Sequence, residues 1–383
     1  DETASLLAEK AEGWIVGLRL AALSMRVLSD DRAFAQRFRG TSSALIVEYL
    51  LNEVLARQSP EIQDFVLRTS VLDRFCAPLC QVLTEIPAER SQQIIDRMAG
   101  ANLFVVPLDE EGKWYRYHHL FRDLLRPRLA KQYGTPIVPE LHARAGAWYA
   151  KNGLVDEALD HLLAANHRTA AADLVARHRT EMLNQARWSR LERWLRRFSP
   201  DVIDQYPDLL ILKTWLLYHQ TRYAELPASL ERLEASLARV ALAPDTLDHL
   251  QGEMDAVRSL LAYFAANAQA TIVHAQGSLE KTRPDLWIVR SLARLTLALA
   301  LQMEGDLQGA YAAIYDGFAQ EKGSSPAFKA TLLVTACNVH WMAGDLQGLT
   351  QAAGQCIELS QGAESPEMGN WGHYHLACAR HQH

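Results

Sequence analysis

The pair His118 and His119 stands where residue types and spacing offer the most chemistry in this sequence. Both lie in the run WYRYHHLFRDLLRPRL, residues 114–129, where an aromatic, strand-like stretch gives way to a basic amphipathic one. Neighbouring imidazoles can ligate a metal ion, exchange protons in acid–base catalysis, or donate hydrogen bonds to a phosphate. They can equally be structural or surface residues, so the choice depends on the elements around them.

Other signatures of catalysis or metal binding are absent. The sequence contains no G-x-x-x-x-G-K-[ST], G-x-G-x-x-G, H-E-x-x-H or G-x-S-x-G motif. Cys76 and Cys80 have no second Cys or His pair nearby to complete a zinc site, so we expect them to pack inside helices. The histidines near the C-terminus lack Cys or carboxylate partners at ligand spacing. We therefore expect neither an enzyme active site nor a metal site.

Amino-acid composition further limits the classes of protein to which this chain can belong. The chain has 383 residues, a net charge of −6 and five cysteines. The net negative charge argues against direct nucleic-acid binding. No apolar run is long enough to span a membrane. The small number of cysteines favours a reducing compartment such as the cytoplasm. The run RWSRLERWLRRF, residues 187–198, could touch nucleic acid, but an amphipathic helix with core tryptophans and solvated arginines is preferred. The absence of an initiator Met and an incomplete last repeat point to a fragment.

The first third of the chain predicts helices followed by one hairpin. Apolar residues recur at helical spacing within residues 1–40 and 44–58, and Ser59-Pro60 is a helix start with Ser as N-cap. The β-rich runs LFVVPL and KWYRY are separated by Asp-Glu-Glu-Gly, a turn-forming cluster. Residues 103–108 and 113–117 should therefore pair. Helices plus one β-hairpin describe a winged-helix module, although a small packing domain of no specific type fits the pattern too.

From residue 139 onward the pattern predicts helices alone. Gly146, Tyr149 and Ala158 match small and aromatic positions of the tetratricopeptide pattern. The hexamers ANAQAT, GDLQGA and GDLQGL begin at residues 266, 305 and 344, a spacing of 39 residues each time. An exact period with matching turn residues indicates an α-solenoid. We expect antiparallel helix pairs that turn near residues 153, 222, 266, 305 and 344.

The quoted segments together resemble a known family. GWIVGLRLAALSM, SALIVEYLLNEVLARQSPEIQDFVLRTSVLDRFCAPLCQVL, YRYHHLFRDLLRPRL and WLRRFSPDVIDQYPDLLILKTWLL, in this order, are similar to the large ATP-binding regulators of the LuxR type, a group of STAND ATPases. The resemblance implies a mainly α fold: residues 1–40 as a helical part of the nucleotide-binding module, 41–135 as a winged helix, and 136–383 as a tetratricopeptide-like superhelical sensor. A P-loop ATPase domain and a DNA-binding domain, present in the family, are missing here.

The resemblance also gives the histidine pair a role. In related STAND proteins the winged helix carries a Met-His-Asp-type motif whose histidine contacts the β-phosphate of bound ADP. Tyr117-His118-His119 looks like this motif, with Tyr for Met and His119 for Asp. The resemblance implies that His118 contacts ADP when the ATPase domain is present, from a face of the hairpin end that is open to that domain. ATP or ADP is therefore expected for the parent protein and no cofactor for this segment. The alternative is a structural histidine at the hairpin end.

The repeats are the expected sensor. Counting back from the turns places Tyr263, Gln302, Asn338 and Trp341 on the concave side, where an aromatic shelf with amide groups suits a small polar ligand such as a sugar. Packing between helices is the alternative for Tyr263 and Trp341. We expect a segment that relays binding of a small-molecule inducer or regulatory protein to the missing ATPase domain, with oligomerisation of the activated parent. A repeat scaffold for a protein partner without an inducer is the second hypothesis.

Overall fold

The computed structural model describes residues 55, 58–100, 105–320, 326–361 and 366–381. These residues fall into two compact units, 1–171 and 172–383. The helices expected within residues 1–40 and 44–58 lie outside the described residues, apart from residues 55 and 58. Among the described helices, none has the length and apolar character that crossing a membrane requires.

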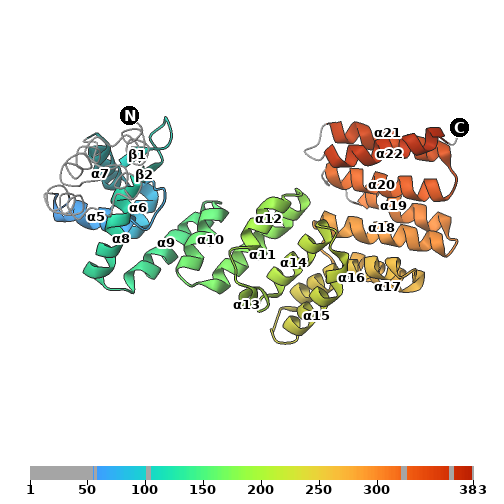
Figure 1. The fold of residues 1–383 in the computed structure, drawn as a ribbon, viewed down its shortest axis with the longest axis horizontal. Coiled ribbons are helices and arrows are strands. Elements are labelled where there is room, and N and C mark those ends of the chain that lie inside the picture. Colours follow the sequence, from blue (N-terminus) through green and yellow to red (C-terminus); the bar gives the residue numbers. More distant parts are fainter. Residues whose placement is uncertain (1–54, 56–57, 101–104, 321–325, 362–365, 382–383) are drawn as a thin grey trace, which may run out of the picture. The chain divides into compact units, whose positions relative to one another are not determined.

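The first unit begins with helices of a winged-helix module (Figure 1). The expected start at Ser59-Pro60 is confirmed, because the Ser59 side chain accepts a hydrogen bond from the Ile62 N–H at 3.4 Å and Pro60 opens the helix. The segment that contains Cys80 and the one that ends at Gly100 are also helical. The elements are α5 (Pro60–Thr69), α6 (Ala77–Thr84), α7 (Ala88–Gly100), β1 (Val105–Pro107), β2 (Tyr115–Tyr117) and α8 (His119–Tyr133).

The predicted hairpin is confirmed over the described residues. β1 and β2 are antiparallel, with Val105 opposite Tyr117 and Pro107 opposite Tyr115. Phe75 extends this small sheet, because its backbone exchanges hydrogen bonds of 2.7 and 2.9 Å with Tyr115. The Tyr117 hydroxyl, buried beneath the sheet, lies 2.7 Å from the Thr69 hydroxyl on α5. The hairpin is thereby tied to the helices that precede it.

A helical hairpin, α9 (Ile137–Lys151) and α10 (Val155–Ala164), completes the first unit. Gly146 and Ala158 let the two helices approach closely: a Cβ at Gly146 would stand 2.9 Å from the Leu162 side chain. Tyr149 is buried between them. The tetratricopeptide-like positions expected from the sequence are thus the contact positions of this pair.

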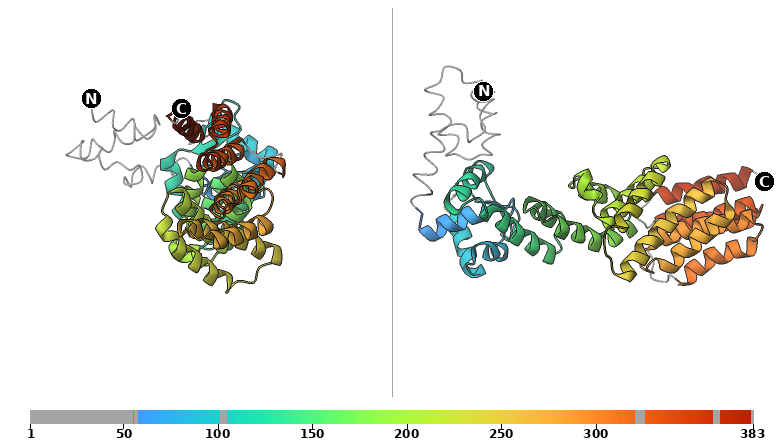
Figure 2. Two further views of the ribbon diagram at one scale, coloured as in Figure 1. Left: turned by 90° about the vertical axis from the view of Figure 1, so that its right-hand side faces the viewer. Right: turned by 90° about the horizontal axis from the view of Figure 1, so that it is seen from below.

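The second unit is entirely helical in its described part, as expected. Figure 2 shows these helices stacked side by side in two further views. After α11 (Arg168–Asn184), whose first residues belong to the first unit, the elements are α12 (Trp188–Leu195), α13 (Pro200–Ile203), α14 (Pro207–His219), η2 (Tyr223–Glu225), α15 (Leu226–Leu237), α16 (Pro244–Phe264), α17 (Ala268–Lys281), α18 (Trp287–Met303), α19 (Leu307–Gln320), α20 (Pro326–Met342), α21 (Leu346–Gln361) and α22 (Pro366–His381).

One turn geometry recurs at the predicted 39-residue spacing. Ala266, Gly305 and Gly344 all adopt positive φ, and the next residue of each turn donates its N–H to the carbonyl five positions earlier. This is the Schellman pattern of a helix C-terminus. The aligned side chains then cap the second helix: Asn267 accepts from Ala270 N–H at 3.0 Å, Asp306 from Gly309 N–H at 2.8 Å and Asp345 from Gly348 N–H at 2.9 Å.

The turns predicted near residues 153 and 222 are confirmed as well. Gly153 and Thr221 have positive φ between successive helices. Two further turns of this kind, at Asn166 and Ala186, were not predicted, because neither carries a glycine nor follows the 39-residue spacing. The predicted fold class, a winged-helix module with one hairpin followed by a tetratricopeptide-like α-solenoid, is confirmed.

Candidate functional site

His118 lies where the sequence placed it, between β2 and α8. Its backbone is the N-cap of α8, and its carbonyl accepts hydrogen bonds from the Phe121 and Arg122 N–H groups at 3.0 and 3.1 Å. The side chain is only 4 % exposed, whereas an open face had been expected. Its position at the junction of a strand and a helix, next to the aromatic sheet, accounts for this burial. The role of His118 as a phosphate ligand stays a prediction.

The winged helix and the α9–α10 hairpin share a dense interface around Arg74. The Tyr149 hydroxyl on α9 donates to the Arg74 carbonyl at 2.7 Å, and the Arg74 guanidinium pairs with Glu157 on α10. The same guanidinium lies over the Trp114 ring at 4.5 Å, and Trp114 meets Trp148 of α9 edge-on at 6.2 Å. Movement of the hairpin is therefore coupled to the loop before α6 and to the end of the β-hairpin.

A histidine pair lies within the same helical hairpin. The Nδ1 atoms of His142 on α9 and His161 on α10 are 2.9 Å apart, so one imidazole must donate and the other accept. The pKa of each group is lowered from 6.5 to about 4, mainly by burial and, for His142, also by the neighbouring His161. Both are neutral near pH 7. No local pattern pairs residues nineteen positions apart, which is why this contact was not predicted.

The four predicted ligand residues lie on three successive first helices of the repeats. Tyr263, Gln302 and Trp341 are 39 residues apart and occupy one repeat position, on α16, α18 and α20. The Gln302 amide donates to the Val339 carbonyl at 2.9 Å, and α20 also carries Asn338, whose amide donates to Val334 of its own helix. Gln302 and the end of α20 are therefore brought together.

The solvent exposure of these side chains differs from one repeat to the next. Tyr263 is partly buried and packs against the apolar core of the repeats, whereas Trp341 is 39 % exposed. The Oε1 atom of Gln302 is buried and has no hydrogen-bond partner among the described residues. Ligand binding by this set stays a prediction, and helix packing accounts for part of the burial of Tyr263.

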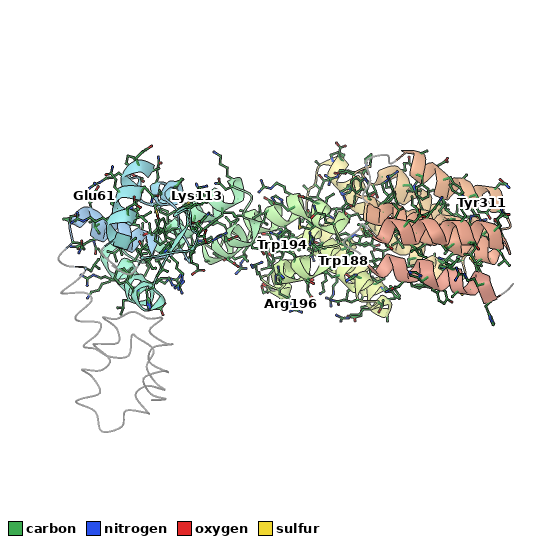
Figure 3. The ribbon with its side chains drawn as sticks, turned by 90° about the horizontal axis from the view of Figure 1, so that it is seen from above. Glu61, Lys113, Trp188, Trp194, Arg196 and Tyr311 are labelled. Atoms are coloured by element: carbon green, nitrogen blue, oxygen red, sulfur yellow. The ribbon has the colours of Figure 1, made fainter. Side chains whose placement is uncertain are left out.

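Sequence reasoning missed a polar cluster beside this row. The His340 Nδ1 lies 2.8 Å from the Asp345 carboxylate and 3.0 Å from the Tyr311 hydroxyl, and the Tyr315 hydroxyl is 3.5 Å from Nε2. Tyr311 is marked on α19 in Figure 3. The Gly348 N–H, and then His340, hold the pKa of Asp345 below its ordinary value. The sequence did align Asp345 with Asp306 at the 39-residue spacing, but this alignment predicted a turn and not a contact with His340.

A buried ion network lies before the repeats. Arg179 on α11 donates two hydrogen bonds, of 2.7 and 3.0 Å, to the fully buried Glu253 on α16, and a third of 3.2 Å to Asp208 on α14. The Trp215 indole N–H donates to Glu253 at 2.7 Å. Burial alone lowers the pKa of Arg179, but Glu253 and Asp208 reverse this and raise it above its ordinary value. His249, 3.4 Å from Glu253, has a pKa lowered by burial.

Asn184 at the end of α11 supports this arrangement. Its side-chain oxygen accepts from the N–H groups of Trp287 and Ile288 at 2.9 and 3.4 Å, and its amide donates to the Asp285 carbonyl at 2.5 Å. The first orphan donors of α18 are thus satisfied by a side chain about 100 residues earlier. The network and this cap together fix α11 against the start of the repeats.

The described residues hold no group of three or more metal-ligating side chains. Cys76 and Cys80 are buried thiols in and beside α6, as expected. In α12, Trp194 is buried and Trp188 stacks on His219 with ring centres 4.3 Å apart, while Arg187, Arg193 and Arg196 are exposed. This is the expected amphipathic helix, and Figure 3 marks Trp188, Trp194 and Arg196 on it.

Part of this sequence is similar to known proteins. Residues 51–136 match the family model described as the MalT winged helix domain. The serine/threonine-protein kinase PknK of Mycobacterium tuberculosis is 33 % identical over 261 residues, which cover 68 % of this chain and 23 % of that protein. The HTH-type transcriptional regulator MalT of Yersinia enterocolitica is 31 % identical over 266 residues, 69 % of this chain and 29 % of that protein. The chain therefore spans less than a third of these relatives.

A solved structure supports the fold. The STAND protein with a tetratricopeptide repeat sensor from Pyrococcus horikoshii superposes with a TM-score of 0.63, covering the whole of this chain and 56 % of that one, at 11 % identity. At this identity the likeness concerns the fold alone. Residues 51–136 are therefore similar to the MalT winged helix domain, about two thirds of the chain is similar to part of the MalT regulators, and the fold is that of a STAND protein with a tetratricopeptide repeat sensor.

Proposed function

We propose that this chain is the sensing and relay segment of a nucleotide-dependent transcriptional regulator. Its relatives include HTH-type regulators and also a protein kinase, all of which share this region over a minor part of their length. A region that accompanies different outputs is best explained as an input module. The interface around Arg74 supports a relay role, because it couples a helical hairpin of the repeat type to the winged helix.

The observation that carries the ligand assignment is the shared position of Tyr263, Gln302 and Trp341. Three equivalent sites on contacting helices carry two aromatic rings and an amide. A sugar supplies a flat face for Trp341, which is 39 % exposed, and hydroxyl groups for the half-buried amide of Asn338. The inducer class proposed is therefore a small carbohydrate, with Asn338 as a further amide contact.

The test uses the 383-residue protein and a panel of mono-, di- and trisaccharides in thermal-shift and calorimetric titrations. The double variant Asn338→Ala, Trp341→Ala should lose the response to the responding sugar while its melting temperature stays within a few degrees of the parent. Folding should survive because Trp341 is partly exposed and the Asn338 amide donates to Val334 of its own helix. Tyr374→Ala, an exposed aromatic on α22, is the matched control and should keep the response. A double variant that folds and still responds places the ligand elsewhere.

The nucleotide end of the relay rests on His118. In a chain that carries the ATPase domain, a buried imidazole at a rigid hairpin end can donate a charge-assisted bond to an ADP phosphate once the domain docks. His118→Ala should then loosen ADP and raise basal transcription. Wild-type ADP retention together with wild-type basal output would remove His118 from this role.

A protein-interaction scaffold without an inducer is the second candidate. Exposed apolar residues at the ends of the repeat helices favour it, namely Phe264, Met303 and Met342. Capture of one protein partner combined with no response to any sugar of the panel would favour this function over the first.

A further inference from the structure

Three exposed apolar side chains share one position in successive repeats. Phe264, Met303 and Met342 are the last residues of α16, α18 and α20, 39 residues apart, and each stands two residues before the positive-φ turn residue. Their exposures are 53, 42 and 59 %. We call these three residues the turn-edge row.

The row is continuous along one edge of the repeats. α16 contacts α18 and α18 contacts α20, so equivalent positions on them are neighbours. Tyr223 extends the row on the side of α15, with its ring centre 5.3 Å from that of Phe264. Single exposed apolar residues are ordinary on protein surfaces, but an aligned group of Phe and Met is typical of an interaction surface, because thioethers adapt to the shape of a partner.

Two of the three turns beside the row are acidic, and the third, at residues 262–270, is uncharged. Segments 262–270, 301–309 and 340–348 contain Glu304, Asp306 and Asp345 and no Lys or Arg. Asp345 is ionised at neutral pH, because the Gly348 N–H and His340 hold its pKa below the ordinary value. The sole histidine of these segments, His340, is buried against that carboxylate. A partner that covers the row therefore meets apolar side chains flanked by negative charge.

We propose that the turn-edge row docks a basic amphipathic helix of a partner protein. Packed helices lie about 8–10 Å apart, so the three rungs repeat at roughly that distance. Two turns of an α-helix advance about 11 Å, so apolar residues at i, i+7 and i+14 of a partner helix match the rungs. Lys or Arg residues beside these anchors would face Glu304 and the turn carboxylates. This surface is separate from the inducer assignment, since it uses the neighbouring repeat position.

The direct test measures binding of a fluorescent 18-residue Leu–Lys peptide, with leucines on one helical face and lysines on the other, to the 383-residue protein by anisotropy. Met303→Ser with Met342→Ser should weaken binding at least tenfold. Phe264→Ser alone should weaken it several-fold and serves if the double variant fails to fold, as judged by circular dichroism. Val273→Ser, an exposed apolar position on α17 outside the row, is the matched control and should bind like the parent.

A second arm tests the charge. A Leu–Glu peptide of the same pattern should bind at least tenfold more weakly than the Leu–Lys peptide, and Glu304→Lys should reduce this preference. Equal binding of the two peptides, or equal losses in Val273→Ser and the row variants, overturns the proposal. So does sedimentation showing that the parent is a dimer that the row variants dissociate, because the row then covers a second copy. Row variants should keep the sugar response, which separates this proposal from the inducer site.

Discussion

The helices before residue 244 and the repeats after it are joined by different kinds of contact. Before it, and across the boundary to α16, single side chains connect residues far apart in the sequence, such as Tyr149 with Arg74 and Arg179 with Glu253. After it, the same short-range hydrogen bonds occur at each turn, with Asn267, Asp306 or Asp345 as the cap. Stability in the first region is concentrated in a few unique residues, whereas in the repeats it is distributed over equivalent local units.

This difference explains why the ion network ends at the first repeat. Glu253 lies on α16, the first helix of the periodic part, and its partners Arg179 and Asp208 lie on helices without a repeat register. The network therefore acts as the fixed end on which the regular helices stack. In the relay proposed above, a signal that passes along the repeats would reach this fixed end.

The largest expected effect follows from breaking this network. Arg179→Met leaves the Glu253 carboxylate buried without its cation, and removing one partner of a buried ion pair typically costs about 3–5 kcal/mol. Urea unfolding of the second unit should show this loss. Arg193→Met on the exposed face of α12 is the control, with an expected change within about 0.5 kcal/mol. A loss under about 1 kcal/mol in Arg179→Met would mean that the network does not stabilise the fold.

The next largest effect should be a loss of stability of the first unit in acid, through its histidine pair. His142 and His161 are neutral in the fold with a pKa of about 4, whereas they bind protons below about pH 6.5 when unfolded. Stability of the first unit should therefore be full above pH 6.5 and fall as pH is lowered toward 4. Thermal melts across this range measure the effect.

His142→Phe removes one of the two titrating groups and should flatten this pH dependence. His373→Phe, at an exposed position on α22, should leave it unchanged. An identical pH profile in His142→Phe would contradict the assignment of the acid sensitivity to this pair.

The same contrast decides what could be predicted from the sequence. The hairpin, the Ser59 cap and the 39-residue turns follow from local residue types, so they were predicted correctly. Arg179 and Glu253 are 74 positions apart with no motif between them, and no local rule pairs them. The candidate ligand row was found from the repeat period, but the exposure of its members depends on neighbouring helices. The turns at Asn166 and Ala186 carry no glycine and stand outside the 39-residue spacing, and they were not predicted.

Removing the repeat caps should have moderate and similar effects. Asn267→Ala, Asp306→Ala and Asp345→Ala each lose one N-cap hydrogen bond, which costs about 1 kcal/mol. Asp345→Ala should cost somewhat more, because His340 also loses its carboxylate partner. Differential scanning calorimetry of single and double variants measures this. Because the caps lie in separate turns, the effects of Asn267→Ala and Asp345→Ala should add, and strong non-additivity would show that the repeats are not independent units.

The smallest effect concerns the one repeat turn without glycine. Ala266 adopts φ 54°, where Gly305 and Gly344 stand in the next repeats. The left-handed conformation costs an alanine about 1–2 kcal/mol, and the greater freedom of glycine in the unfolded chain offsets roughly half of this. Ala266→Gly should therefore raise the melting temperature slightly, by a stability gain of about 0.5–1 kcal/mol, and Gly305→Ala should lower it by a similar amount. If Ala266→Gly destabilises the protein instead, contacts of the Ala266 methyl group matter more than backbone strain, and this turn is not equivalent to the other two.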